Sequence, residues 1–219
     1  MIRTPDLIDI LAEELKPVRR LRSPGFRAMC WGIVAAAIMV LLAISQGVRA
    51  DLAQRLGDAS FTVALAGSAA TAVLGAGAAF ALAVPGRSRL WALLPLPALL
   101  MWISAIGQQC LAHWVSYDAD AMMMGDTVRC FATVVLTSLP LWLLMLLMLR
   151  RSGAVRRVLP MLAGSLAVSA AAGVAMNVLH ALDASAMILF WNFGTGAAIV
   201  LVSALFSQPL LKRSLSFGN

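Results

Sequence analysis

The 219-residue sequence is poor in charge and contains six long stretches that lack Asp, Glu, Lys and Arg altogether. Only 12% of its residues are charged, whereas 61% are hydrophobic. The uncharged stretches are residues 28–45, 61–84, 90–111, 130–149, 158–179 and 184–206. Each has 18 or more residues, which is enough for a helix to cross a hydrocarbon layer about 30 Å thick. The sequence therefore predicts an all-α integral membrane protein with six transmembrane helices.

The absence of charge inside these stretches also narrows the function. Transporters and proton pumps use intramembrane charged groups to bind ions or relay protons, so their absence counts against transport. The sequence contains no G-x-S-x-G motif, no H-E-x-x-H motif and no phosphate-binding glycine loop. We therefore expect no enzymatic activity and no cofactor. A small transporter or channel component, or a scaffold for another membrane protein, remains the alternative to a signalling protein.

The basic residues that are present indicate the orientation in the membrane. Fourteen of the 17 lie in residues 1–27, in two of the breaks between stretches, and in the C-terminal tail. The positive-inside rule places these segments, and hence both termini, in the cytoplasm. The first stretch is longer than a signal-peptide core, so we expect it to be retained. We divide the chain into a cytoplasmic partner-binding segment (1–27), a transmembrane domain (28–208) and a cytoplasmic tail (209–219).

The net charge of +7 is consistent with the same interpretation. Because the basic residues flank membrane spans, anionic lipid headgroups account for them and no direct nucleic-acid binding is expected.

Small residues recur inside two of the stretches at a spacing of four residues. Such rows let helix backbones approach closely in lipid, and we expect them to form helix–helix contacts. The two rows are Gly67, Thr71, Gly75 and Ala79, and Ser165, Ser169 and Gly173.

The N-terminal segment predicts a short amphipathic helix. Thr4 and Pro5 suit its start and Pro17 its end. Its apolar residues fall on one arc and its acidic residues on the other. The arc comprises Leu7, Ile8, Ile10, Leu11 and Leu15, and the acidic face comprises Asp6, Asp9 and Glu13. Helices that lie on membranes normally carry basic residues, so the acidic face favours a protein partner, while docking onto this protein's own loops stays open.

Several short motifs resemble the NrsF-type family of membrane anti-sigma factors, the negative regulators of sigma F. They are Leu7-Ile8-Asp9, Pro17-Val18-Arg19-Arg20-Leu21, Val84-Pro85-Gly86-Arg87 and Leu179-His180, spread over essentially the whole chain. The resemblance implies a protein of the bacterial inner membrane whose N-terminal segment sequesters an extracytoplasmic-function sigma factor. It implies release of that factor by an external stress, in some members metal or oxidant. The implied partner-binding residues are Asp6, Leu7, Ile8, Asp9, Leu11 and Leu15.

The family also implies a cysteine near the start of the fourth span and another directly after the Leu-His pair. Cys130 matches the first position, but Ala181 occupies the second, so a scheme that needs both thiols does not carry over.

Four residues with metal-binding or redox side chains are predicted near the outer membrane face. Cys110 and His113 lie near the end of the third stretch, Cys130 begins the fourth, and His180 follows the fifth. Two thiols and two imidazoles suit a metal site, with His113 and His180 as additional ligands. Cys110 and Cys130 equally suit redox sensing, a plain structural disulfide, or ordinary buried positions. Cys30 is expected at the opposite face, too far away to join them.

Overall fold

The computed structural model describes residues 22–113, 124–150 and 158–179, and in this part of the chain every regular element is a helix. Side chains are described for 22–108, 132–150 and 158–179. Five helical segments are long and apolar enough to span a membrane. They are α2 (Pro24–Gln46), α4 (Ala59–Leu82), the segment Arg89–Gln108, α6 (Met124–Arg150) and α7 (Val158–Leu179).

These five segments coincide with five of the six predicted stretches and are helical, as predicted. The sixth stretch, 184–206, lies outside the described residues, as do the predicted N-terminal helix and the tail. A short helix, α3 (Leu52–Arg55), lies in the connection between α2 and α4.

Local sequence explains where α2 begins and ends. The Ser23 hydroxyl accepts a hydrogen bond from the Phe26 amide, and Pro24 occupies the first turn, where a missing N–H costs nothing. Gly47 stops the helix with a φ of 82°, a conformation that favours glycine. After Pro24, α2 continues to Gln46 without another proline.

Prolines break the third span. A 3₁₀-helix, η1 (Arg89–Leu93), precedes α5 (Leu96–His113), and Pro95 lies in the break between them. Pro95 and Pro97 have no N–H with which to continue a helical hydrogen-bond ladder. The two prolines indicate a disturbed helix here, and the structure shows a change of helix type.

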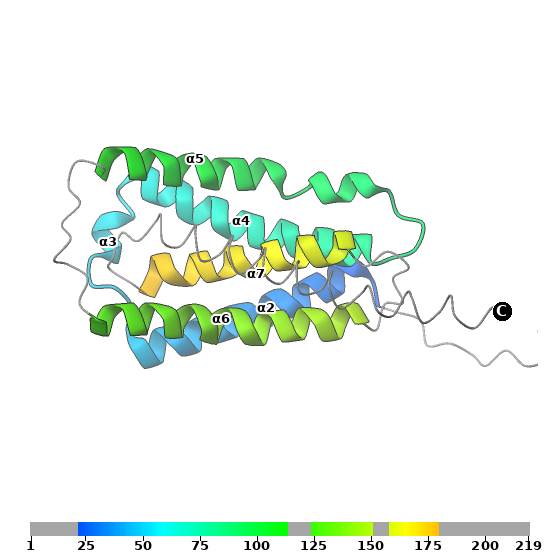
Figure 1. Cartoon of the computed structure of the whole chain (residues 1–219), viewed down its shortest axis with the longest axis horizontal. Coiled ribbons are helices and arrows are strands. Elements are labelled where there is room, and N and C mark those ends of the chain that lie inside the picture. The colour runs from blue at the N-terminus through cyan, green and yellow to red at the C-terminus, as the bar shows by residue number, and fades with distance from the viewer. Residues whose placement is uncertain (1–21, 114–123, 151–157, 180–219) are drawn as a thin grey trace, which may run out of the picture.

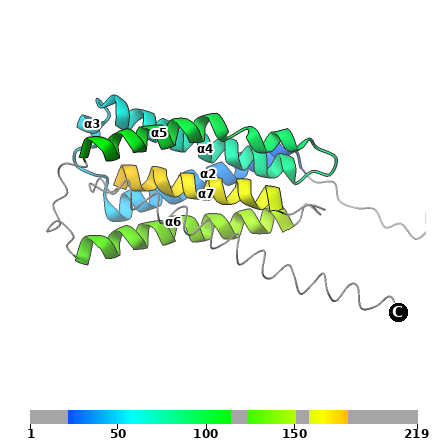
Figure 2. The same cartoon turned by 45° about the horizontal axis from the view of Figure 1, so that its top comes forward.

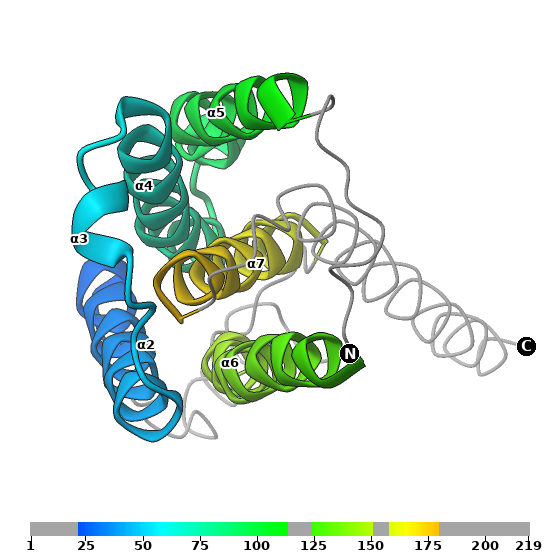
Figure 3. The same ribbon diagram turned by 90° about the vertical axis from the view of Figure 1, so that its left-hand side faces the viewer.

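Helix α7 lies in the middle of the bundle. In Figure 1 and Figure 3 it runs between α5 and α6, with α4 and α2 completing the bundle on one side. Figure 2 shows the same helices running side by side along one axis. The starts of α2 and α7, the ends of α4 and α6, and η1 share one end of the bundle, here named the Arg27 end. The opposite end, with α3, the end of α7 and the start of α6, is named the Arg49 end.

Glycines bring α4, α5 and α7 into close contact. A Cβ added at Gly75 of α4 would lie 3.2 Å from the Ala167 Cβ of α7. A Cβ at Gly67 would lie 3.0 Å from the Trp102 backbone of α5, and one at Gly173 of α7 would lie 2.7 Å from the Trp102 ring. The three helices therefore form a core in which glycines let a neighbouring backbone, or the Trp102 ring, approach closely.

The predicted small-residue row on α4 is confirmed, because Gly67, Thr71, Gly75 and Ala79 are all buried. On α7 the prediction was right only at Gly173. Ser165 and Ser169 are partly buried, whereas the fully packed positions include Ala163, Ala167 and Ala171. Since α7 is rich in alanine on most of its faces, the spacing of small residues alone could not identify the face turned toward α4.

Candidate functional site

The structure leaves the predicted binding and sensing residues untested. Asp6, Leu7, Ile8, Asp9, Leu11 and Leu15 lie outside the described residues, and so does His180. Cys110 and His113 lie in α5 and Cys130 in α6, but their side chains are not among those described. Helix α5 ends and α6 begins at the Arg49 end (Figure 1). Among the residues that the structure describes, no group of three His, Cys, Asp or Glu side chains is placed to hold a metal ion.

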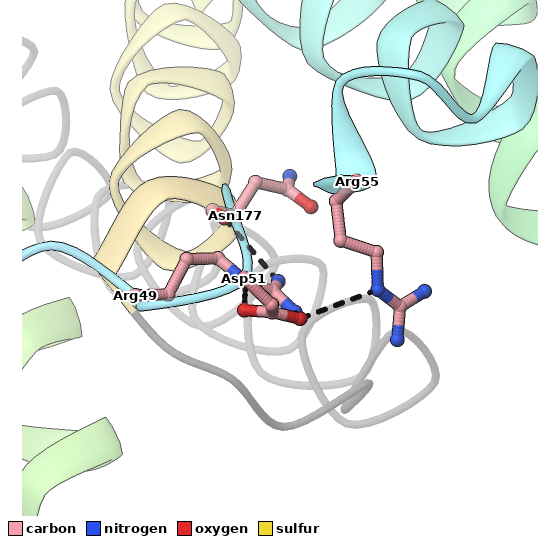
Figure 4. A network of polar contacts seen from close by, with 4 residues as sticks. All are labelled: Arg49, Asp51, Arg55 and Asn177. Carbon is pink, nitrogen blue, oxygen red and sulfur yellow. Dashed lines mark hydrogen bonds and ion pairs between the residues drawn. The ribbon is translucent and has the colours of Figure 1, made fainter. Parts of the chain in front are cut away.

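A polar network occupies the Arg49 end, where the connection between α2 and α3 meets the end of α7 (Figure 4). The Arg49 guanidinium donates two hydrogen bonds of 2.7 Å, one to each carboxylate oxygen of Asp51. Arg55 approaches the same carboxylate at 3.5 Å. Hydrogen bonding from Arg49 lowers the pKa of Asp51 from 3.8 to about 2. The carboxylate is therefore charged at any ordinary pH.

Arg49 also fastens this connection to α7. Its backbone N–H donates to the Val178 carbonyl at 3.2 Å, and its guanidinium donates to the Asn177 carbonyl at 3.5 Å. Carbonyls in the last turn of a helix have no partner within the helix, and a cation there also interacts favourably with the helix dipole. The Arg49 side chain is only 2% exposed and lies over the Phe61 ring. The network thus connects the α2–α3 loop, the start of α4 and the end of α7.

A second buried arginine lies at the other end of α2. Arg27 donates a hydrogen bond to the Met148 carbonyl near the end of α6. Its guanidinium also lies over the Phe80 ring of α4, 4.8 Å from the ring centroid. Arg27 therefore joins the start of α2 to the ends of α4 and α6. Arg49 similarly joins the loop after α2 to the end of α7.

Two further hydrogen bonds join α2 to α6 between these ends. The Trp31 indole N–H donates to the Leu141 carbonyl at 3.2 Å. The Thr133 hydroxyl of α6 donates to the Gln46 side-chain oxygen at 2.7 Å. With Arg27 and Met148, α2 is bonded to α6 at three depths along its length. We name these three contacts the α2–α6 seam.

Sequence reasoning missed both the Arg49 network and the seam. For the network a signal exists, because Arg49 and Asp51 lie two residues apart in a loop with few basic residues, a pattern that favours an ion pair. The seam has weaker signals, because Trp31, Gln46 and Thr133 are ordinary residues for a membrane helix. Their partners follow only from the packing.

Comparison with known proteins gives one match that covers most of the chain. The family model described as negative regulator of sigma F (NrsF) matches residues 11–212. No curated protein and no solved structure matches.

Proposed function

Since this chain belongs to the NrsF family of negative regulators of sigma F, we propose that it is a membrane anti-sigma factor for an extracytoplasmic-function sigma factor. The match over residues 11–212 is the observation that carries the proposal. The five long apolar helices support it, because they suit a protein that holds its partner at a membrane. The proposed role needs neither catalysis nor a cofactor.

The proposed orientation has six spans in the bacterial inner membrane and both termini in the cytoplasm. The described arginines support it, since they divide between the two ends of the bundle as the positive-inside rule requires. Arg22, Arg27, Arg87, Arg89 and Arg150 belong to helix ends and connections at the Arg27 end. The Arg49 end instead combines Arg49 and Arg55 with Asp51 and Asp58. The Arg27 end is accordingly the cytoplasmic one.

The sigma factor would be held by the N-terminal amphipathic helix through its apolar stripe. Burying such a stripe in a groove is a common way for one protein to capture another. The acidic residues Asp6 and Asp9 would then meet basic residues around the groove. Because α2 begins at Pro24, the captured protein would lie close to the cytoplasmic membrane face.

The test is to purify the full chain from its native host and identify a co-purifying sigma factor by mass spectrometry. Leu11→Asp places a charge in the middle of the stripe and should weaken binding by about 3 kcal/mol, or roughly a hundredfold in Kd. Transcription from promoters of that sigma factor should then be constitutively high.

Ala12→Asp is the matched control, because it adds the same charge about 100° away around the helix. It should retain the sigma factor. If Leu11→Asp retained as much sigma factor as the wild type at equal abundance, the stripe would not be the docking surface.

Release by an external stress is proposed to use Cys110 and Cys130, with His113 and His180 as additional ligands if the signal is a metal. Cys130 occupies the position that the family resemblance indicates, and Cys110 is its proposed partner. Formation of a disulfide would transfer two electrons to an external oxidant and release two protons. Either chemistry would draw the end of α5 and the start of α6 together.

A further inference from the structure

Helix α2 is attached to the bundle along a narrow line. Its buried residues are Arg27, Trp31, Ala35 and Leu42, which follow one another at helical spacing on a single face. Large apolar side chains cover much of the remaining surface, including Ile33, Leu41 and Ile44, which are more than 60% exposed. Among the described helices, these exposed side chains do not fix α2 to a neighbour.

The seam compensates for this thin packing. Hydrogen bonds to α6 lie near the first turn of α2 at Arg27, at Trp31, and at its last residue, Gln46. The core helices α4, α5 and α7 are instead held by close glycine contacts. Helix α2 therefore has its hydrogen bonds to other helices with α6, whereas its contact with α4 consists of side-chain packing such as that of Arg27 over the Phe80 ring.

Helix α6 has features that favour bending between its two seam contacts at Thr133 and Leu141. The Thr137 hydroxyl bonds back to the Thr133 carbonyl, and the Ser138 hydroxyl bonds back to the Val134 carbonyl. Pro140 follows and cannot donate a hydrogen bond within the helix. Back-bonding hydroxyls and prolines both favour bending. The first part of α6, which carries Thr133, can thus change direction relative to the part that carries Leu141 and Met148.

The two ends of α2 lie near different groups of residues in the proposed mechanism. Its last residue, Gln46, contacts Thr133, which lies three residues after Cys130. Arg49, just beyond its end, holds Val178, two residues before His180. Its first turn continues directly into the N-terminal segment. One straight helix therefore connects the surroundings of the proposed sensing residues with the proposed sigma-binding arm.

We propose that α2 carries the external signal across the membrane as a rigid rod, with the Gln46–Thr133 contact as the point where movement of α6 enters. Tilting α2 at Gln46 displaces its other end at Arg27 and so repositions the arm. This inference rests on the proposed anti-sigma function for its biological meaning. The proposed mechanical connection between Thr133 and the opposite end of α2 can be tested without any sigma factor.

The native Cys30 thiol reports on the far end of α2. It is a free, half-buried cysteine that lies 16 residues before Gln46, or about 24 Å along the helix. The experiment measures its alkylation rate by N-ethylmaleimide in the full chain in lipid nanodiscs, with mass spectrometry of the peptide that contains Cys30. Thr133→Val removes the hydroxyl without changing the shape of the side chain. We expect the rate to change by roughly twofold to tenfold, the factor that corresponds to the net free energy of one hydrogen bond.

Thr71→Val is the matched control. Thr71 is also fully buried, but it lies in α4 and its hydroxyl bonds to the Gly67 carbonyl of its own helix, so it belongs neither to the seam nor to the bending point of α6. It should leave the Cys30 rate unchanged. Gln46→Leu removes the other partner of the same contact and should reproduce the effect of Thr133→Val, which keeps the test decisive if one variant does not accumulate in the membrane.

An unchanged Cys30 rate in both seam variants would overturn the proposal, and so would equal changes in Thr133→Val and Thr71→Val. If the rate changes only in Thr133→Val and Gln46→Leu, α2 transmits the change as a rigid rod, whichever partner the chain binds. Absence of a co-purifying sigma factor would then count against the proposed function alone.

Discussion

Replacing Gly173 by alanine should destabilise the bundle by about 2 kcal/mol, because it forces a methyl group into the Trp102 ring. The new Cβ would lie 2.7 Å from Trp102 Cζ2 and 3.2 Å from Cη2. Carbon atoms in good contact lie about 3.5–4.0 Å apart, so the ring would have to retreat by about 1 Å. It has no room, since the Trp102 backbone already lies against Gly67 and the side chain is buried.

The free energy of unfolding can be measured by reversible SDS titration of the purified protein in mixed micelles. Gly77→Ala is the matched control, since no atom lies within 4 Å of the added Cβ, and its stability should be unchanged or slightly raised. Combining Gly173→Ala with Trp102→Phe should show a favourable coupling, because the smaller ring relieves the clash. Wild-type stability in Gly173→Ala would mean that α5 and α7 do not meet as closely as described.

Three further predictions concern the orientation in the membrane, the ion pair of Asp51 with Arg49, and the proposed sensing cysteines. Reporter fusions should be external at three aspartates and internal at three other sites, and an internal signal at Asp120 would contradict the six-span orientation. The external sites are Asp51, Asp120 and Asp183, and the internal sites are Ser88, Gly153 and Asn219. Because the pKa of Asp51 is lowered to about 2, its contribution to stability should be complete above its ordinary pKa of 3.8 and disappear only as the pH falls through about 2. Thermal unfolding as a function of pH should show this acid step in the wild type and not in Asp51→Asn. Replacing Cys110 and Cys130 together by serine should preserve sigma-factor retention and abolish release by oxidant or metal, as a sigma-dependent reporter would measure. Unchanged induction in that double variant would place the sensor elsewhere.

Span positions could be predicted from the sequence because they depend on a one-dimensional property. A helix in hydrocarbon must satisfy its own backbone and present apolar side chains to lipid, so an uncharged stretch of sufficient length is a direct signal. The stretch 158–179 coincides with α7, and the stretch 61–84 differs from α4 by two residues at each end. The course of the third span was harder to predict. Pro95 and Pro97 indicate a disturbed helix, but they do not distinguish a kink from a separate 3₁₀-helix such as η1.

Which faces meet could be predicted only in part. The α4 row is buried as predicted, whereas on α7 the buried small residues include Ala163, Ala167 and Ala171 rather than Ser165 and Ser169. Both helices carry small residues on several faces, so the spacing of these residues does not by itself decide which face packs. The polar contacts of α2 were not predictable, because Trp31 and Thr133 bond to groups more than 80 residues away in sequence. Their partners include the Leu141 main-chain carbonyl, a group that every residue carries.

The two ways of holding helices in this bundle suit different mechanical tasks. Glycine contacts such as Gly173 with Trp102 tolerate almost no displacement, because dense packing loses its favourable contacts within a fraction of an ångström. A side-chain hydrogen bond such as that between Gln46 and Thr133 can follow a moving partner by rotating about side-chain bonds. A protein that must remain folded while passing a change across the membrane needs both properties. In the proposed mechanism, the core of α4, α5 and α7 is the fixed frame, and the seam is the set of contacts through which α6 moves α2, the helix that follows the proposed sigma-binding arm in the sequence.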